Sequence, residues 1–355
     1  MLHVDREQVL AFRVAGHHLH ARTDPLTAVA ACGLQEYPPG WAAVALHARS
    51  EQPLDADQVV TVNAMRGAPY VVPRDDAAVF TVALVPDDAG LKALVGTFTA
   101  REVVAGGHSV RDALDQVAGA ARRGLADGPL GRDAFHQALR ERLPPSLLPW
   151  CRGCQSHHVR PGLWRALGPL GVTRMTAKAT WALAEPAPMP ISHARAELAR
   201  RFLRCYGPAT HTHLAGWAQT APAHAQALFA SIAAELEAIQ VDGQRRWVLA
   251  ADRPRLEDPP RARGVRMLGG HDPYMAQPDR NALVTDQAMR KRLFPAVGRP
   301  GVVLRDGVLA GLWRSRKKGD VLEIEPEWLG EPVDLAGEAA AVARARWCDS
   351  ARLTA

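Results

Sequence analysis

The chain has 355 residues, enough for two or three domains of about 100–200 residues each. Apolar residues make up 47% and charged residues 23%, a balance that is typical of globular proteins and argues against a disordered chain. The net charge of +6 favours a polyanionic partner. An arginine-rich composition also arises from a GC-rich genome, so the position of the charges matters more than their sum.

The composition also bears on the cellular compartment. The N-terminal residues include acidic side chains and no long apolar run, so we expect no signal peptide. No stretch approaches the roughly 18–20 apolar residues that a membrane span requires. The cysteines are odd in number and scattered, which is typical of reduced thiols in a cytoplasm: Cys32, Cys151, Cys154, Cys205 and Cys348.

Four helices and a strand are expected in the first 75 residues. Apolar periodicity predicts a helix over 6–18, and Asp24-Pro25 opens a second helix that Gly33 ends. Further helices are expected over 41–48 and 54–64, followed by a short strand at Tyr70–Pro73.

A weak internal repeat is the most informative feature of the middle of the chain. Gly128-Pro129 and Gly207-Pro208 each follow one amphipathic helix and precede others, and each segment leads to a hairpin. Three helices and a hairpin are the parts of a winged helix-turn-helix. The expected helices and hairpins are 108–125, 132–143, 157–167 and 171–183 in the first copy, and 193–206, 211–218, 222–236 and 239–249 in the second.

The last hundred residues are expected to form an antiparallel sheet. A hairpin around Asp306-Gly307 leads to a basic turn at 314–320, a strand at 321–325 and a closing helix at 335–347. The predicted fold is therefore α+β and mostly helical, with tandem winged-helix modules and a C-terminal antiparallel sheet. The expected boundaries are 1–105 (a divergent module), 106–190, 191–252 and 253–355.

Several short segments, in the right order along the chain, carry a resemblance to a known family. They are Gly33-Leu34-Gln35, Met65-Arg66-Gly67, Gly207–Thr210, Asp272, Arg280 before Phe294, and Val308–Trp313. The chain resembles the winged-helix DNA-binding-domain proteins that include the AlkZ-like alkylpurine and crosslink-unhooking DNA glycosylases. The resemblance implies base excision repair by hydrolysis of an N-glycosidic bond. This chain differs from the family pattern at Tyr37, where glutamine or aspartate is usual, and at Tyr70, where histidine is usual.

The resemblance places the candidate active site at Gln35, Glu36 and Tyr37. A glutamine amide can orient a water molecule, and a carboxylate can in addition oppose the positive charge of an oxocarbenium-like sugar. In an extended segment Gln35 and Tyr37 point the same way and Glu36 points away. The alternatives are that Gln35 caps the preceding helix and that Glu36 faces solvent or forms a salt bridge.

Candidate DNA contacts are concentrated in a predicted hairpin turn. Four cations lie within five residues, Arg314, Arg316, Lys317 and Lys318, and a polyanion would neutralise them, although a solvated loop is the alternative. Weaker candidates are Arg66, Tyr70 and the Arg245-Arg246 pair. Asp272 is a candidate for site support, either by holding an arginine or by capping the next helix.

Cys151-x-x-Cys154, followed by His157-His158, is half of a zinc motif. A structural zinc ion needs four ligands, and no second pair is evident. We therefore expect the two thiols to pack in a core with the histidines exposed beside DNA, and we expect neither a metal nor a cofactor.

Together these features predict a monomeric cytoplasmic protein, associated with the nucleoid, that binds double-stranded and lesion-containing DNA and no membrane. The primary hypothesis is a monofunctional DNA glycosylase acting on alkylated or bulky-adducted purines. The rival hypothesis is a non-catalytic winged-helix DNA-binding protein, a lesion sensor or transcriptional regulator, and the substitutions at Tyr37 and Tyr70 favour it.

Overall fold

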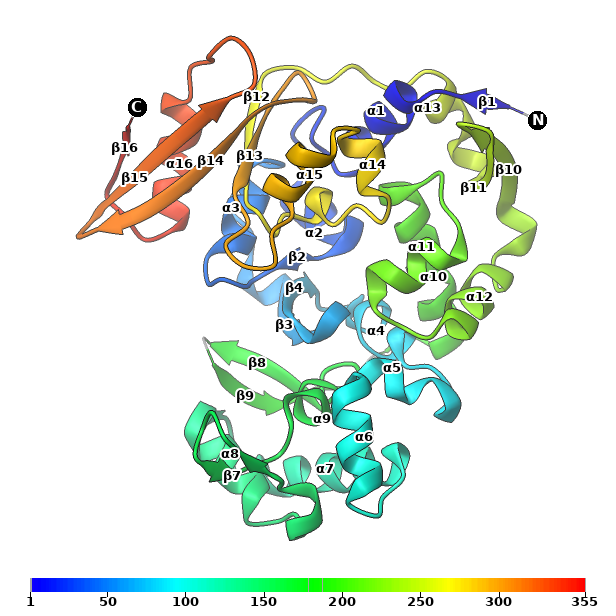
Figure 1. Ribbon diagram of the computed structural model, residues 1–355, viewed down its shortest axis with the longest axis vertical. Helices are drawn as coiled ribbons and strands as arrows, with labels where there is room; N and C mark the ends of the chain where they lie inside the picture. The colour runs from blue at the N-terminus through cyan, green and yellow to red at the C-terminus, as the bar shows by residue number, and fades with distance from the viewer. Residues whose placement is uncertain (1, 178, 187, 355) are drawn as a thin grey trace. The chain divides into compact units, whose positions relative to one another are not determined.

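The computed structural model describes residues 2–177, 179–186 and 188–354. The described residues combine helices with mostly antiparallel sheets, which confirms the expected α+β class (Figure 1). They fall into two compact units. Unit 1 comprises Met1–Asp55, Arg200–His213 and Ile232–Ala355, and unit 2 comprises Ala56–Ala199 and Leu214–Ser231. The division into four consecutive modules remains a prediction.

The N-terminal helices of unit 1 follow their sequence signals. Helix α1 (Arg6–Gly16) begins with a capping box in which the Asp5 side chain accepts a hydrogen bond from the Gln8 amide. Helix α2 (Pro25–Cys32) has Asp24 as its cap, and α3 covers Trp41–His47. Gly16 ends α1 beside α10 (Ile191–Tyr206), where a Cβ atom would lie 2.0 Å from the Arg204 carbonyl oxygen. The three predicted helices are confirmed.

A five-stranded sheet forms the C-terminal part of unit 1. Its strands, in spatial order, are β12 (Val265–Leu268), β13 (Gly301–Arg305), β14 (Val308–Lys318), β15 (Val321–Trp328) and β16 (Ser350–Leu353). Neighbours are antiparallel except β15 and β16, which are parallel. Helix α16 (Ala336–Ala345) packs Val342 against Trp313 and Ile324 of this sheet (Figure 1). The predicted sheet and closing helix are confirmed.

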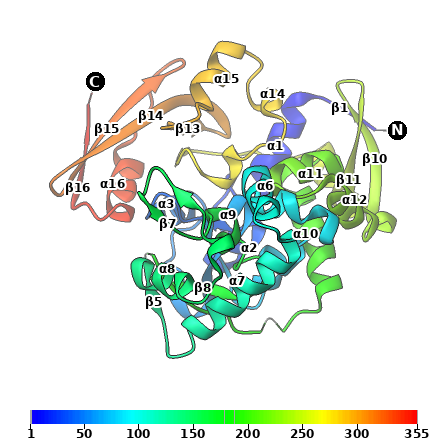
Figure 2. The ribbon, with the colours of Figure 1, turned by 60° about the horizontal axis from the view of Figure 1, so that its bottom comes forward.

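A smaller sheet in unit 1 joins the N-terminus to a hairpin. Strand β1 (His3–Val4) runs parallel to β10 (Leu236–Val241), which pairs with β11 (Gln244–Leu249) (Figure 2). The turn residues Asp242 and Gly243 both have positive φ, as the Asp-Gly signal predicts. The shorter elements of unit 1 are β2 (Leu34–Gln35), α13 (Arg253–Glu257), α14 (Arg280–Leu283) and α15 (Gln287–Leu293).

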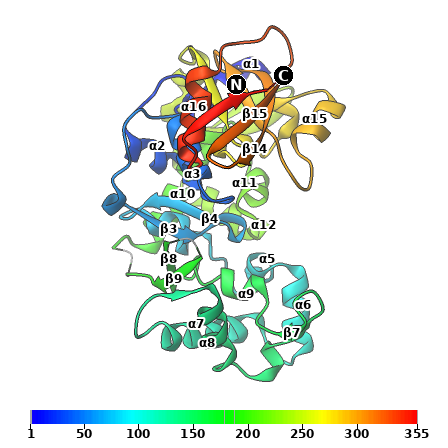
Figure 3. The same ribbon diagram turned by 90° about the vertical axis from the view of Figure 1, so that its left-hand side faces the viewer.

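Unit 2 contains a sheet and a group of helices. The strands are β4 (Pro69–Pro73), β3 (Val59–Asn63), β8 (Thr173–Ala177), β9 (Thr180–Leu183) and β5 (Leu130–Gly131). The helices are α4 (Ala77–Phe80), α5 (Leu91–Val95), α6 (Thr97–Ala105), α7 (Val110–Gly124), α8 (Arg132–Arg140) and α9 (Pro161–Arg165) (Figure 3). Leu114 of α7, Phe135 of α8, Leu163 of α9 and Trp181 of β9 lie in one apolar cluster. A two-stranded hairpin, β6 (Trp150–Cys151) and β7 (Ser156–His157), completes the unit.

Three further helices carry the second copy of the predicted repeat. They are α10 (Ile191–Tyr206), α11 (His211–Ala218) and α12 (Pro222–Ala230). The order of helices and hairpin matches the prediction in both copies, although the helix expected over 222–236 ends at Ala230 because β10 begins at Leu236.

One predicted helix is wrong. The segment 54–64 contains only a short 3-10 turn, Ala56–Gln58, and then strand β3. Four of the five residues of β3 are valine or threonine, and these β-branched side chains favour a strand when neighbouring strands can pair with it.

Among the described residues, no helix is both long and apolar enough to cross a membrane.

A buried ion pair joins the end of α3 to the segment after β12. Arg49 Nη2 lies 2.7 Å from Asp272 Oδ1, and Nη1 lies 2.8 Å from Oδ2. The two side chains are only 1% and 0% exposed. Burial opposes the charge of Arg49, but the Asp272 carboxylate outweighs it and raises the pKa of Arg49. Asp272 also accepts a hydrogen bond from the Tyr274 amide at 2.8 Å, so it both holds an arginine and caps a turn.

A second buried arginine connects α1 to the C-terminal half of unit 1. Arg13 is 0% exposed and donates to the Gly207 carbonyl at 3.1 Å, to Gln277 Oε1 at 2.9 Å and to Asp279 Oδ1 at 2.5 Å. Asp279 also pairs with Arg246 of β11. Burial alone would raise the pKa of Asp279, but Arg13 and Arg246 hold it below its ordinary value.

We predict that Asp272→Asn strongly destabilises the protein. The variant leaves the Arg49 guanidinium buried without its counter-charge, a change that typically costs about 3–5 kcal/mol. The measurement is the free energy of unfolding in urea. The control is Glu51→Gln, because Glu51 forms an exposed ion pair with Arg22 and such pairs contribute less than about 1 kcal/mol. Equal losses in the two variants would contradict a dominant role for the buried pair.

A pH dependence follows from the lowered pKa of Asp279. A carboxylate with a depressed folded-state pKa stabilises the protein above its unfolded-state pKa, about 3.9, and loses that contribution as the pH falls through the folded-state value. We predict that Asp279→Asn lowers the free energy of unfolding at pH 7 by about 3 kcal/mol. The gap should begin to narrow below about pH 4, where the Asp279 carboxyl of the unfolded chain binds a proton while that of the folded protein stays charged.

The check is urea unfolding of both proteins at several pH values between 7 and 3. Asp258→Asn, at an exposed aspartate, is the control and should show no pH-dependent gap. A gap for Asp279→Asn that stays constant down to pH 3 would show that the charge of Asp279 does not stabilise the fold.

Candidate active site

The glutamine of the predicted site lies in a turn that the preceding residues define. Asp24 starts α2, and Gly33, with φ of 70°, ends it in a conformation that disfavours other residues. The chain then enters β2, where Leu34 is buried and Gln35 is only 8% exposed. The Gln35 Nε2 atom donates to the Tyr37 carbonyl oxygen at 3.2 Å, which orients the amide within its own loop.

Glu36 is engaged at the start of the next helix. Its Oε1 atom accepts a hydrogen bond from the Gly40 amide at 2.8 Å, and Oε2 accepts one from the Ala42 amide at 3.0 Å. A carboxylate at this position satisfies free N–H groups at the positive end of α3. The sequence alternatives for Glu36 were a solvent-facing side chain or a salt bridge, and this contact is a third role that alternation did not suggest.

Tyr37 does not share the environment of Gln35. The Tyr37 side chain is 59% exposed, whereas Gln35 is buried. The alternation expected from an extended segment does not hold, because β2 ends at Gln35 and the chain turns at Tyr37-Pro38 and onward into α3. The same helix is anchored just beyond its far end, where Arg49 pairs with Asp272. Asp272 therefore supports the segment that follows the site.

Arg66 and Tyr70 line a second polar region, in unit 2. Arg66 lies between β3 and β4 with φ of 58°. Its guanidinium donates to the Trp217 carbonyl and to the Tyr70 hydroxyl, each at 2.6 Å. Arg66 also lines a cavity of about 180 Å³, together with Arg165 and Gln219. The structure thus brings the two residues into direct contact, with Arg66 at a cavity that carries a second arginine.

The arginines of the β10–β11 hairpin have different roles. Arg245 is exposed, and its guanidinium lies 4.6 Å from the centre of the Trp247 ring. Arg246 has an 11% exposed side chain and pairs with Asp279 in the buried network described above. Arg245 therefore faces solvent, whereas the charge of Arg246 is used inside the protein.

The basic turn predicted at 314–320 is instead a continuation of strand β14. The strand runs through Lys318, and only Gly319 and Asp320 form the turn. All four predicted cations are exposed. Acidic residues lie opposite two of them on β15, because Arg314 is in register with Glu325 and Arg316 with Glu323. Lys318 forms an ion pair with Glu323 at 2.8 Å, and Lys317 donates to the Trp347 carbonyl oxygen.

The expectation that Cys151 and Cys154 pack in a core is wrong. Both residues lie in the β6–β7 hairpin, where Cys151 is partly exposed and Cys154 is exposed. Their sulfur atoms and a ring nitrogen of His158 all lie within 4.8 Å of one another. The backbone amide of Cys154, followed by the His158 imidazole, lowers the pKa of Cys151 to about 6. The hairpin pairs only four residues, too few to enclose the two thiols, so both remain near the surface.

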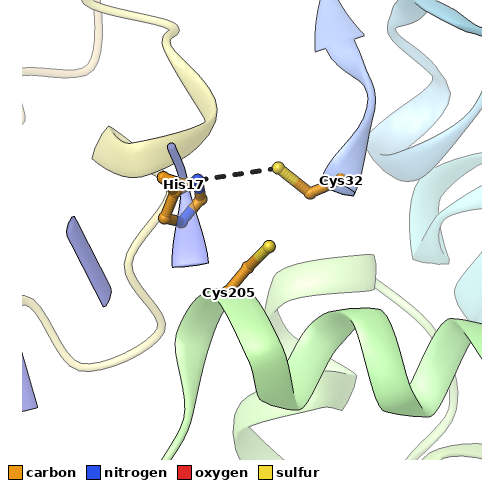
Figure 4. Close-up of side chains that lie close together, drawn as sticks. All are labelled: His17, Cys32 and Cys205. Carbon is orange, nitrogen blue, oxygen red and sulfur yellow. Dashed lines mark hydrogen bonds between the residues drawn. The ribbon is translucent and has the colours of Figure 1, made fainter. Parts of the chain in front are cut away.

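A second cluster of sulfur and nitrogen atoms is buried in unit 1, at His17, Cys32 and Cys205 (Figure 4). Cys32 Sγ lies 3.6 Å from His17 Nδ1, and Cys205 Sγ donates to the carbonyls of Gly16 and Ala31 at 3.5 Å each. A hydrogen bond with Cys205 and burial raise the pKa of Cys32. The two buried thiols pack the ends of α1 and α2 against α10.

Sequence reasoning missed Arg13, Arg49 and Asp279, and also the convergence of His158 on the two cysteines. Charged residues on amphipathic helices are normally solvated, so burial of an arginine has no local signal. The only available signal was Asp272, which sequence analysis marked as a possible arginine partner.

The comparisons with known proteins agree on one family. The family model described as DNA glycosylase AlkZ-like matches residues 28–347. An interstrand DNA cross-link repair glycosylase from Streptomyces sahachiroi is 30% identical over 152 residues, which is 41% of this chain and 41% of that relative. The matched region is therefore less than half the length of the relative.

A solved structure gives the likeness of the whole fold. It is the Streptomyces sahachiroi DNA glycosylase AlkZ, which covers 99% of this chain and 100% of its own, with a TM-score of 0.74 and 22% identity. That identity establishes a shared fold, and the family match over most of the chain establishes the relationship. The chain belongs to the AlkZ-like DNA glycosylase family.

Proposed function

We propose that this protein is a monofunctional DNA glycosylase that hydrolyses the N-glycosidic bond of alkylated or bulky-adducted purines in double-stranded DNA. The observation that carries the proposal is the position of Gln35 in a chain of this family. The turn at Gly33 places the Gln35 side-chain amide at the end of β2. The end of α2 holds this loop on one side, and the hydrogen bond from Gln35 to the Tyr37 carbonyl holds it on the other.

The chemistry of such a substrate suits a neutral amide. A purine alkylated at N7 is cationic and leaves without a general acid. The enzyme then has to stabilise an oxocarbenium-like sugar and to position a water molecule on its opposite face. The Gln35 Nε2 group donates to the Tyr37 carbonyl. The amide oxygen Oε1 is the acceptor that would orient the water. Tyr37, at the surface beside it, would contact the DNA.

The role of Glu36 is the main question about this site. Both of its carboxylate oxygens accept hydrogen bonds from amides at the start of α3. This supports a structural role for Glu36 and assigns the chemistry to Gln35. The same contacts also support the rival function, a non-catalytic DNA-binding protein, because the carboxylate in this segment is already bound to backbone amides.

DNA binding is proposed to depend on winged-helix modules and on the basic strand β14. The order of helices followed by a hairpin in residues 106–190, and again in residues 191–252, supports a winged-helix module in each segment. Four exposed cations in five residues support phosphate contact by the β14–β15 hairpin, with the exposed Arg66 and Arg245 as further contacts. Tyr70 is only 3% exposed, so its proposed role is to hold Arg66 through its hydroxyl.

We predict that Gln35→Ala abolishes base release while duplex affinity stays within about threefold, because one neutral group adds little to many phosphate contacts. Loss of the water-orienting amide should lower the rate by about 10²–10³. The assay follows release of the base from duplex containing N7-methylguanine or a crosslink, read as alkali-labile abasic sites. Gln52→Ala, at an exposed glutamine of unit 1, is the matched control and should retain activity.

Glu36→Gln separates the two roles of the neighbouring carboxylate. It should retain most of the activity and lower the stability of the protein by about 1 kcal/mol, the usual effect of losing a helix cap. If it abolishes activity while Gln35→Ala does not, the carboxylate activates the water. If the wild-type protein releases no base from any alkylated duplex, the non-catalytic function is the correct one.

We also predict that neutralising Arg314, Arg316, Lys317 and Lys318 together, by replacement with glutamine, weakens duplex binding similarly for all sequences. The log–log salt dependence should become shallower by about one unit for each lost phosphate contact. Fluorescence anisotropy at several salt concentrations measures both quantities.

A charge-matched variant controls for net charge. It replaces four exposed arginines outside β14 and outside the predicted modules 106–190 and 191–252 with glutamine, namely Arg261, Arg263, Arg305 and Arg344. Equal losses in the two variants would attribute the effect to net charge. Unchanged affinity and slope in the β14 variant would remove this strand from the DNA interface.

A further inference from the structure

The β6–β7 hairpin of unit 2 carries three potential metal ligands at chelating distance. Cys151 and Cys154 are separated by two residues, and His158 follows four positions later. Their ligand atoms all lie within 4.8 Å of one another. Zinc binds sulfur at about 2.3 Å and imidazole nitrogen at about 2.0 Å, so small side-chain shifts would bring all three atoms onto one ion.

The histidine is oriented as a metal ligand would be. His158 Nδ1 is 2.8 Å from the Val159 carbonyl oxygen, so this nitrogen carries the proton and donates it. The opposite nitrogen, Nε2, is buried and makes no hydrogen bond within the described part of the chain. A backbone carbonyl that fixes the tautomer and leaves the other nitrogen as an electron-pair donor is the usual support for a zinc-bound histidine.

The neighbouring histidine has a different environment. His157 Nδ1 lies 2.8 Å from the Leu148 carbonyl oxygen, and its ring packs edge-on against Trp150 at 5.2 Å across the hairpin. His157 is exposed, and its ring is not among the atoms that converge on the sulfurs. The two adjacent histidines therefore provide a matched pair, one at the cluster and one beside it.

Backbone amides and an arginine surround the Cys151 sulfur. The amides of Cys154 and Gly153 lie beside the Cys151 sulfur, and Arg160 faces it. Arg160 also donates to Glu102 at 2.7 Å and to the Trp150 carbonyl at 3.1 Å, which holds this arginine at the base of the hairpin. Arg132 is close enough to act on Cys154.

The hairpin itself needs a constraint. Strands β6 and β7 pair only Trp150 with His157 and Cys151 with Ser156, and isolated hairpins of this size are marginally stable. An ion held by a residue of β6, a residue of the turn and a residue just after β7 would close the hairpin. Two thiolates and one imidazole suit zinc, and they leave a fourth tetrahedral position for water.

We propose that Cys151, Cys154 and His158 form a zinc-binding site that fixes the β6–β7 hairpin. This site lies outside the Gln35 loop, and the proposal is independent of glycosylase activity. Thiols at this spacing could instead form a disulfide, and the experiment below distinguishes the two.

The first test is the metal content of the full-length protein purified under reducing conditions without chelator. We expect about one zinc per chain by elemental analysis. Cys151→Ser and His158→Gln should each lower the bound zinc at least about tenfold, since two remaining ligands bind weakly. His157→Gln, beside the cluster, and Cys348→Ala, at a distant buried cysteine, should keep it. Circular dichroism of each variant checks that it has folded.

Two measurements on the wild-type chain do not depend on the folding of variants. Cobalt added to chelator-treated protein should produce the near-ultraviolet absorption of thiolate-bound cobalt. Trypsin should cleave after Arg152, which is exposed between the two cysteines, at least about tenfold faster after chelation, because the freed turn can open. Arg152→Ala should remove that cleavage and keep the zinc.

The outcomes are distinct. Metal-free protein that takes up neither zinc nor cobalt, or that shows a Cys151–Cys154 disulfide with both sulfurs unavailable to a thiol reagent, would overturn the proposal. Equal loss of zinc in His157→Gln and His158→Gln would overturn the assignment of His158 as the third ligand.

Discussion

Two buried arginines join segments of unit 1 that lie far apart in the sequence. Arg49 is neutralised by Asp272, and Arg13 by Asp279, and each guanidinium also reaches a backbone carbonyl. A buried charge is tolerated only when it is paired and hydrogen-bonded, so each pair specifies one arrangement of its segments. These pairs fix α1 and the residue after α3 relative to the segment that follows β12. The Gln35 loop depends on them because it leads directly into α3.

The candidate site illustrates how neighbouring polar residues divide their roles. Gln35 is buried with a fixed amide, Glu36 binds the amides at the start of α3, and Tyr37 is at the surface. In such a catalytic segment the neutral amide of Gln35 would orient the water, and the charged carboxylate of Glu36 would stabilise the start of α3. This division of roles agrees with the proposed substrate. A cationic base leaves without proton donation, so the main task of the site is to position a water molecule.

Much of the fold could be predicted because its signals are local. Asp24-Pro25 and Gly33 mark α2, and the Asp-Gly pairs mark the β10–β11 and β13–β14 turns, since only a few residue types accept those backbone angles. The segment 54–64 was misassigned because its pattern fits a helix and a strand, and pairing with β4 and β8 decides between them. Strand β14 was ended too early because consecutive cations suggest a loop, whereas cross-strand glutamates allow a strand.

The sequence by itself determined the family, the α+β class, the positions of most helices and hairpins, and Asp272 as a partner for an arginine. Only the tertiary structure decided which charged residues are buried, that Arg246 pairs inward while Arg245 faces solvent, and that Glu36 caps a helix. It also decided that His158 meets Cys151 and Cys154. The reason is physical: caps and turns depend on bonds between near neighbours, whereas burial, charge pairing and ligand convergence depend on which distant segments the folded chain brings into contact.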